Sequence, residues 1–267
     1  MKKLVLLFIF CWFTVSIRSQ SITSFGKNTG EFSPMLENLY QMMKKQQYKM
    51  TLDGKERVVN VGWIRDETHV LKAMKYWQPE MKDVVEFFLE KQKPEGLFMD
   101  YIYPIEDGVS NRSNFFEPKY CLVLPKDKKI MHRLPVEADV EYLMVEAVLY
   151  IWQATGDESF IKKWLPALEK GLLYMMSDPA RWSKKYQLVK RGYTIDTWDF
   201  MILPMTIPEY AKRFGDPSRG IMNITDTTRM GIMHGDNSGL YAACRQVSQM
   251  HKALKNEVQA QIWEKQA

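Results

Sequence analysis

Two consecutive apolar segments with helical periodicity, separated by a short turn, constrain the fold of this 267-residue chain more than any other feature. Apolar side chains recur at helical spacing over residues 140–151, and the same period returns over residues 161–175. Gly156 and Asp157 lie between the two segments and form the expected turn. The pattern therefore predicts a helical hairpin, and Pro166 predicts a late start or a kink in its second helix.

The rest of the chain shows the same preference for helices. Helical periodicity covers residues 35–47, 67–77 and 238–254, and no strong series of strands is visible. Two connections, residues 97–135 and 178–233, are long, and loops of this length in a compact domain usually serve function or form a lid. We therefore expect an all-α fold of helical hairpins, arranged as a layered toroid whose long loops form a cleft.

Composition and charge narrow the class of protein. Hydrophobic residues make up 46% of the chain, which is enough for one sizeable core. The formal charge of +5 is spread along the sequence in short lysine runs interrupted by acids, which predicts a solvated basic surface rather than nucleic-acid binding. The four histidines lack metal-site spacing, and no nucleotide-binding motif is present. We expect no metal and no cofactor, with calcium on loop carboxylates as an open alternative.

The first twenty residues have the layout of a secretory signal peptide. Two lysines precede an apolar run over residues 4–17, and small and polar residues follow. We expect cleavage near Ser19 or Gln20, which would place the mature protein in the periplasm or outside the cell and off the membrane. An uncleaved anchor is the alternative. Residues 21–60 then form an N-terminal segment, and residues 61–267 form the main domain.

Two of the four motifs that carry chemistry precede or begin predicted helices. In "GWIRDE", Trp63, Arg65 and Asp66 stand at the start of a helix, where an arginine beside an aspartate can hold sugar hydroxyls through charge-assisted hydrogen bonds. Asp66 could instead serve only as the helix N-cap. In "VEADVEYL", Asp139 begins the first helix of the hairpin, and this motif alone indicates no more than a buried helix.

The third motif, "RGYTIDTWDF", places two acids on either side of a tryptophan. Tyr193, Asp196, Trp198 and Asp199 all lie within it. A tryptophan in a regular element is usually part of the core, whereas a tryptophan bracketed by acids is typical of a sugar-binding cleft. Taken alone, the motif does not choose between these interpretations.

The fourth motif, "HGDNSGLY", combines polar side chains with flexible backbone before a helix. His234, Asp236 and Asn237 precede Tyr241, and two glycines allow a close approach of the backbone. The alternative interpretation is a simple turn in which Asp236 or Asn237 caps the helix.

Taken in order, the four motifs resemble those of the six-hairpin glycosidases, which include glucoamylases, the glucosidase domain of glycogen debranching enzymes and trehalase-like hydrolases. The resemblance covers residues 61–254. It implies an (α/α)6 barrel and inverting hydrolysis of oligosaccharides, in which one carboxylic acid protonates the leaving oxygen and a second carboxylate activates water. The "GDNS" run is also similar to the general-acid loop of some processing glucosidases.

The resemblance assigns roles residue by residue. Asp199 directly follows Trp198 and matches the general acid, although the glucoamylase pattern has glutamate there. Asp196 is the alternative acid, or a helper that binds a hydroxyl. Trp198 and Tyr193 would stack on sugar rings. The remaining substrate-binding candidates are Trp63, Arg65, Asp66, Asp139, His234, Asp236 and Asn237.

The resemblance also implies that part of the enzyme is missing. In the family pattern the general base lies on a late hairpin, and nothing after Asp236 matches it. We therefore expect about half a barrel, doubtful activity for this chain alone, and a complementing C-terminal half as a partner. The alternatives are a non-catalytic carbohydrate-binding or interaction protein on the same toroid, or a polysaccharide lyase that uses His234 with Tyr241.

Overall fold

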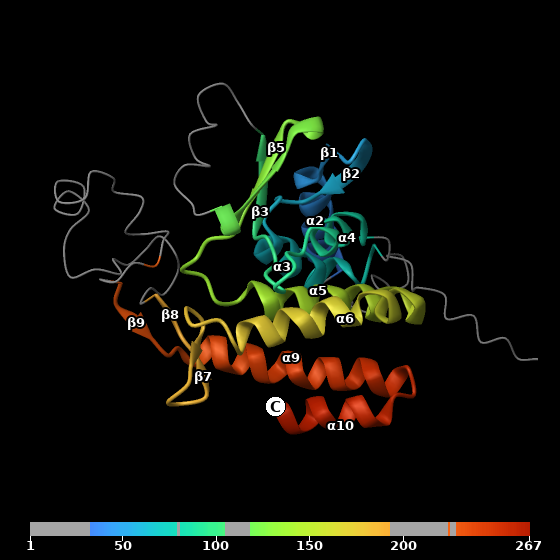
Figure 1. Cartoon of the computed structure of the whole chain (residues 1–267). Helices are drawn as coiled ribbons and strands as arrows, with labels where there is room; N and C mark the ends of the chain where they lie inside the picture. Colours follow the sequence, from blue (N-terminus) through green and yellow to red (C-terminus); the bar gives the residue numbers. More distant parts are fainter. Residues whose placement is uncertain (1–32, 79–80, 105–117, 193–223, 225–227) are drawn as a thin grey trace, which may run out of the picture.

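The computed structural model describes residues 33–78, 81–104, 118–192, 224 and 228–267 (Figure 1). The expected signal peptide, residues 1–20, lies outside this part of the chain. Seven α-helices occupy the described residues. They are α2 (Ser33–Gln46), α3 (Ile64–Met74), α4 (Asp83–Glu90), α5 (Val140–Thr155), α6 (Glu158–Met175), α9 (His234–Ala253) and α10 (Glu257–Gln266).

The predicted helical hairpin is confirmed in α5 and α6. Gly156 ends α5 with a left-handed φ of 67°, a conformation that glycine adopts without steric cost. Asp157 caps α6 because its carboxylate accepts hydrogen bonds from the backbone N–H groups of Ser159 and Phe160, at 3.0 and 3.2 Å. The expected late start is wrong, since α6 begins at Glu158 and continues through Pro166.

The helices form a layered arrangement around α5. The helix α5 contacts α3 on one side and α9 on another, while α6 packs against α5 and α9, and α10 packs against α9. Figure 1 shows α5, α6, α9 and α10 running side by side, with α3 and α4 above them. Ten of the sixteen residues of α5 are buried, from Val140 to Ile151, so this helix is the centre of the core.

The all-α expectation holds only for the helical part, because four small antiparallel sheets are also present in the described residues. Residues 97–135, expected as a loop, contain a three-stranded sheet of order β3–β5–β4, and the second long connection contains two short strand pairs. The strands are β1 (Tyr48–Leu52), β2 (Lys55–Val59), β3 (Tyr101–Pro104), β4 (Cys121–Leu124), β5 (Lys129–His132), β6 (Trp182–Ser183), β7 (Leu188–Val189), β8 (Arg191–Gly192) and β9 (Met230–Gly231).

The small sheets fix the segments that lead into the helices. Backbone hydrogen bonds join Asp100 to His132 of β5 at 2.6 Å and to Ile64, the first residue of α3, at 2.7 Å. The pair β8–β9 places Arg191 opposite Gly231, just before α9 begins. Within the described ranges, no helix is both long enough and apolar enough to cross a lipid bilayer.

Candidate functional site

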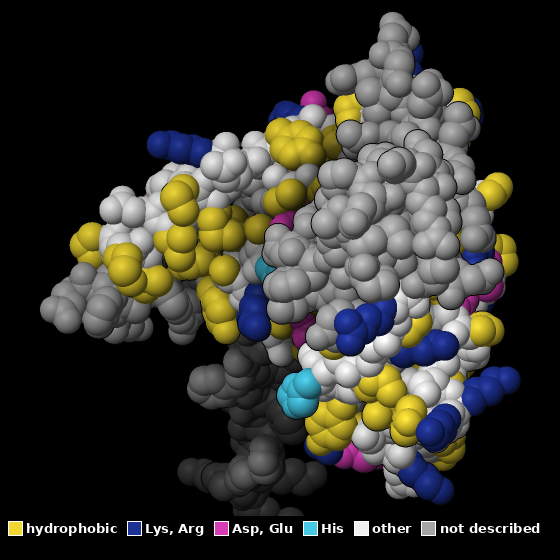
Figure 2. Space-filling model, turned by 90° about the vertical axis from the view of Figure 1, so that its left-hand side faces the viewer, with side chains coloured by type: hydrophobic (Ala, Val, Ile, Leu, Met, Phe, Trp, Pro, Cys, Tyr) yellow, Lys and Arg dark blue, Asp and Glu magenta, His cyan; other side chains and the backbone are white. Residues whose placement is uncertain are grey.

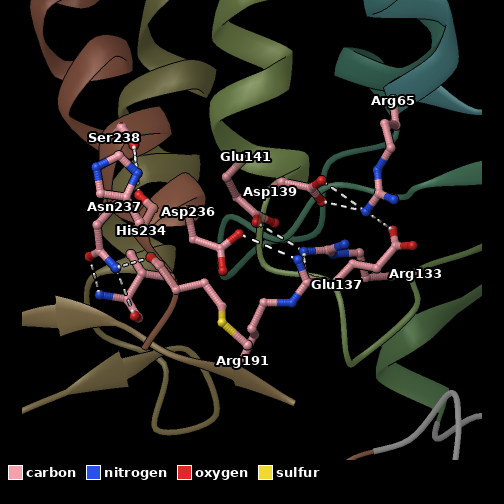
Figure 3. A network of polar contacts seen from close by, with 12 residues as sticks. Arg65, Arg133, Glu137, Asp139, Glu141, Arg191, His234, Asp236, Asn237 and Ser238 are labelled. Carbon is pink, nitrogen blue, oxygen red and sulfur yellow. Dashed lines mark hydrogen bonds and ion pairs between the residues drawn. The ribbon is translucent and has the colours of Figure 1, made fainter. Parts of the chain in front are cut away.

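A network of buried charged side chains lies where three helices begin (Figure 3). The helices α3, α5 and α9 start at Ile64, Val140 and His234, and α5 and α9 begin at the same end of the helical layer (Figure 1). The network consists of four arginines and five acids, namely Arg65, Arg133, Arg181 and Arg191 with Asp100, Glu137, Asp139, Glu141 and Asp236. Figure 2 looks onto this end of the molecule and shows basic, acidic and histidine side chains close together.

Arg65 joins the first two sequence motifs. Its Nη2 donates to Oδ1 and Oδ2 of Asp139 at 3.0 and 2.8 Å, and it lies 3.0 Å from Oε2 of Glu137. Burial by itself would raise the pKa of Asp139, but the charges of Arg65 and Arg133 outweigh burial and hold that pKa below its usual range. Asp139 is therefore ionised and held in a defined orientation.

A second ion pair lies deeper in the protein. Nη2 of Arg133 donates to Oε2 of Glu141 at 3.1 Å and to the carbonyl oxygen of Glu137 at 2.7 Å, and both charged side chains are fully buried. Asp100 is also fully buried. Burial, together with the charge of Glu137, raises the pKa of Asp100 well above its ordinary value and favours its protonated form, although the charges of Arg133 and Arg65 act in the opposite direction.

The third and fourth motifs meet through Arg191 and Asp236. Nη1 of Arg191 lies 3.5 Å from Oδ1 of Asp236, and both side chains are more than nine-tenths buried. Burial raises the pKa of Asp236, and the opposing charge of Arg191 does not fully compensate. Nε and Nη2 of Arg191 and Oδ2 of Asp236 are buried without a hydrogen-bond partner among the described residues.

Tyr142 lies among these charges and was not a predicted site residue. It is half-buried, and burial together with the charges of Asp139 and Asp236 raises the pKa of its hydroxyl. Its ring packs on Gly239 of α9 so closely that a side-chain carbon at that position would lie 2.5–2.7 Å from three ring atoms. Gly239 therefore makes room for Tyr142 between α5 and α9.

The structure separates the remaining residues of the first motif. Trp63 is half-buried and stacks on Tyr101, with ring centroids 4.2 Å apart. Trp63 is the N-cap residue of α3, so the expectation that Asp66 caps this helix is wrong. Asp66 is exposed in the first turn, while Glu67 points inward and accepts hydrogen bonds from Asn60.

The fourth motif divides into a buried part and an exposed part. The N-cap of α9 is Met233, so capping by Asp236 or Asn237 is wrong. Asn237 instead ties α9 to β7, because its side chain accepts from the Val189 N–H at 2.8 Å and donates to the Val189 carbonyl at 3.2 Å. His234 is exposed and its ring lies 3.4 Å from the hydroxyl of Ser238.

The third motif is described only at its first two residues, Arg191 and Gly192 of β8. Tyr193, Asp196, Trp198 and Asp199 lie outside the described residues, so both predicted catalytic acids stay predictions.

The sequence analysis missed six members of the network, namely Asp100, Arg133, Glu137, Glu141, Arg181 and Arg191. A signal was present in "HRLPVEADVE", where four charged residues precede or enter an apolar helix that has no exposed face for them. Charged residues next to such a helix are expected to pair with one another.

One cavity between α6 and α9 is lined by residues that do not belong to the network. It has a volume of about 660 Å³ and lies at the other end of α6 and α9, between Glu158 and His251. No group of three or more histidine, cysteine or acidic side chains in the described ranges could hold a metal ion. Comparison with known protein families, curated proteins and solved structures found no match for this chain.

Proposed function

We propose that this chain is an exported glycoside hydrolase, or a portion of one, that cleaves oligosaccharides by inverting acid–base catalysis. The observation that carries the proposal is the convergence of Arg65, Asp139 and Asp236, which begin three different helices, in one buried network. Charge-assisted donors and acceptors of this kind suit the hydroxyl groups of a sugar.

The arrangement of the helices supports an (α/α)6 toroid as part of the proposal. The helix α5 contacts α3, α6 and α9, and α9 also contacts α6 and α10. A toroid with α3, α5 and α9 as inner helices and α6 and α10 as outer helices would have these contacts. The toroid itself would be tested by an experimental structure that includes residues 193–223.

The chemistry requires two carboxyl groups with different protonation states. Asp199 is the proposed general acid and Asp196 its alternative, as the motif order suggests. Asp236 is a third candidate, because burial raises its pKa and favours the protonated form that a general acid needs. Asp139, which Arg65 keeps ionised, suits binding of a sugar hydroxyl.

The decisive experiment combines hydrolysis with substitution. The full chain is assayed on a panel of aryl α- and β-glycosides, and the anomer released first is identified by NMR. We expect inverted product, loss of at least about a hundredfold in rate in Asp199→Asn, and no change in Asp83→Asn, an exposed acid on α4. If Asp236→Asn abolishes hydrolysis and Asp199→Asn does not, the assignment of the acid is wrong.

A second candidate function is carbohydrate binding without catalysis, and it is favoured by the ion pairs that the acids of the network form with arginines. Glu137, Asp139 and Glu141 each contact an arginine, which suits them for holding a ligand more than for accepting a proton. Saturable binding of oligosaccharides without hydrolysis of any glycoside would support this candidate. If the chain neither binds oligosaccharides nor hydrolyses any glycoside, both candidate functions are wrong.

The described geometry does not favour the lyase alternative, because its two proposed catalytic residues lie apart on one helix. His234 and Tyr241 are seven positions apart on α9, which separates them by roughly 10 Å along the helix. An unsaturated product that absorbs in the ultraviolet would nevertheless support the lyase alternative. Export is tested separately by sequencing the N-terminus of the mature protein, where we expect a start close to residue 21.

A further inference from the structure

Arg191 enters the network with one end of its guanidinium engaged and one edge free. Nη1 faces Asp236, whereas Nε and Nη2 have no hydrogen-bond partner in the described part of the chain. The side chain is only 7% exposed. Nε and Nη2 lie on the same edge of the planar guanidinium and form the fork that binds carboxylates in a bidentate way. A complete pair of donors is therefore free inside the site.

Arg181 adds a second buried cation beside the same acid. It is 1% exposed, and its Nη1 has no hydrogen-bond partner within the described ranges. Its charge acts on Asp236, as does that of Arg191, so both guanidinium groups lie near this carboxylate.

The other arginines of the network already have acids beside them. Arg65 is paired with Glu137 and Asp139, and Arg133 is bonded to Glu141. Glu141 also acts on Arg181, and Asp236 is the described acid that contacts Arg191. Buried guanidinium groups are stable only where their charge is compensated and their donors are bonded.

We propose that Arg191, with Arg181 beside it, binds a carboxylate group of the substrate, so that the oligosaccharide recognised contains a uronic acid. The inference rests on the proposed function, since it names the substrate class for the same site. A planar carboxylate matches the free Nε and Nη2 edge and supplies the hydrogen-bond acceptors that these donors lack. Asp236 holds the opposite end of the guanidinium and fixes the direction of the fork.

The test measures binding of two sugar acids against their uncharged counterparts. Sodium glucuronate, sodium galacturonate, glucose and galactose are titrated into the full chain by calorimetry at constant ionic strength. We expect each acid to bind at least roughly tenfold more tightly than its neutral counterpart.

Matched variants then locate the site. Arg191→Lys keeps the charge and removes the fork, so we expect it to lose roughly tenfold or more in affinity for both acids. Arg245→Lys makes the same change on an exposed arginine of α9 and is expected to bind like the wild type. Circular dichroism checks that each variant is folded. If Arg191→Lys does not fold, the comparison of acidic with neutral sugars on the wild-type protein still tests the proposal.

Several outcomes overturn the inference. They are equal binding of acid and neutral sugars, no saturable binding of either acid, unchanged affinity in folded Arg191→Lys, or competition by inorganic sulfate as strong as by glucuronate. Hydrolysis of neutral aryl glycosides without any preference for aryl glucuronides overturns the inference alone. Binding of sugar acids through Arg191 without hydrolysis of any glycoside overturns the proposed hydrolase and leaves the carboxylate site standing.

Discussion

Arg65 and Asp139, which are 74 positions apart in the chain, form a two-oxygen hydrogen-bonded ion pair at the start of two adjacent helices. One nitrogen of Arg65 reaches both carboxylate oxygens of Asp139 and also Glu137. The contact joins α3 to α5 and determines how the two motifs face each other. It also concentrates three charges in a region with little access to solvent, where breaking a pair is costly.

Removal of the arginine should therefore destabilise the fold. Arg65→Met leaves Asp139 and Glu137 close together without their cation, and we expect a loss of about 3–5 kcal/mol in the free energy of unfolding. Arg245→Met, which removes an exposed arginine paired with Glu264, is the control and should cost about 1 kcal/mol or less. Urea unfolding at pH 7 measures both. Equal losses in the two variants would show that the Arg65 contacts contribute nothing special.

Glu67 should make stability depend on pH near neutrality. Burial, only partly offset by hydrogen bonds from Asn60 and Val61, raises the pKa of Glu67 from 4.5 to about 7. The folded state therefore binds this proton more tightly than the unfolded state. Its contribution is fully present below pH 4.5 and is lost as the pH rises through 7, by about 3 kcal/mol in total.

The matched measurement compares wild type with Glu67→Gln between pH 5 and pH 8. The glutamine cannot ionise, so the difference in the free energy of unfolding between the two proteins should shrink as the pH rises. Parallel stability curves over this range would show that Glu67 does not titrate there.

The close contact between Tyr142 and Gly239 predicts a penalty for a small side chain. Gly239→Ala would force the Tyr142 ring away from α9, and we expect a net loss of about 1–3 kcal/mol although alanine favours a helix. Gly235→Ala in the first turn of the same helix meets no atom within 4 Å and should be neutral or slightly stabilising. Thermal unfolding of both variants checks this. If Tyr142→Ala fails to relieve the penalty in the double variant, the contact is not its cause.

Glu141 should be more important for stability than an exposed glutamate. Glu141→Gln leaves Arg133 buried next to Arg181 without the carboxylate to which it is hydrogen-bonded, so a loss of about 3–5 kcal/mol is expected. Glu56→Gln, which neutralises an exposed acid paired with Lys49 on β1, should change stability by less than about 1 kcal/mol. Guanidinium unfolding at constant pH compares the two, and a small effect in Glu141→Gln would contradict a structural role for the buried pair.

Local pattern was sufficient for the long helices and insufficient for the short strands. The α5–α6 hairpin follows from apolar spacing and from Gly156, because both signals act within a few residues. The strand pairs are two to five residues long, too short for an alternating pattern to be recognised. One local signal was overlooked, since Asp53 and Gly54 both have positive φ in the turn between β1 and β2, as Asp-Gly turns of hairpins commonly do.

The sequence by itself determined the helical hairpin and the position of Asp139 and Asp236 at helix starts, because periodicity and helix boundaries are encoded locally. Only the tertiary structure decided which charges pair. Arg65 pairs with Asp139 and Glu137 and not with the adjacent Asp66, because α3 turns Arg65 toward α5 and leaves Asp66 in solvent. Burial raises the pKa of Asp236, and the Nε and Nη2 donors of Arg191 are buried without a partner among the described residues. Both properties depend on tertiary packing, which a local sequence pattern does not encode.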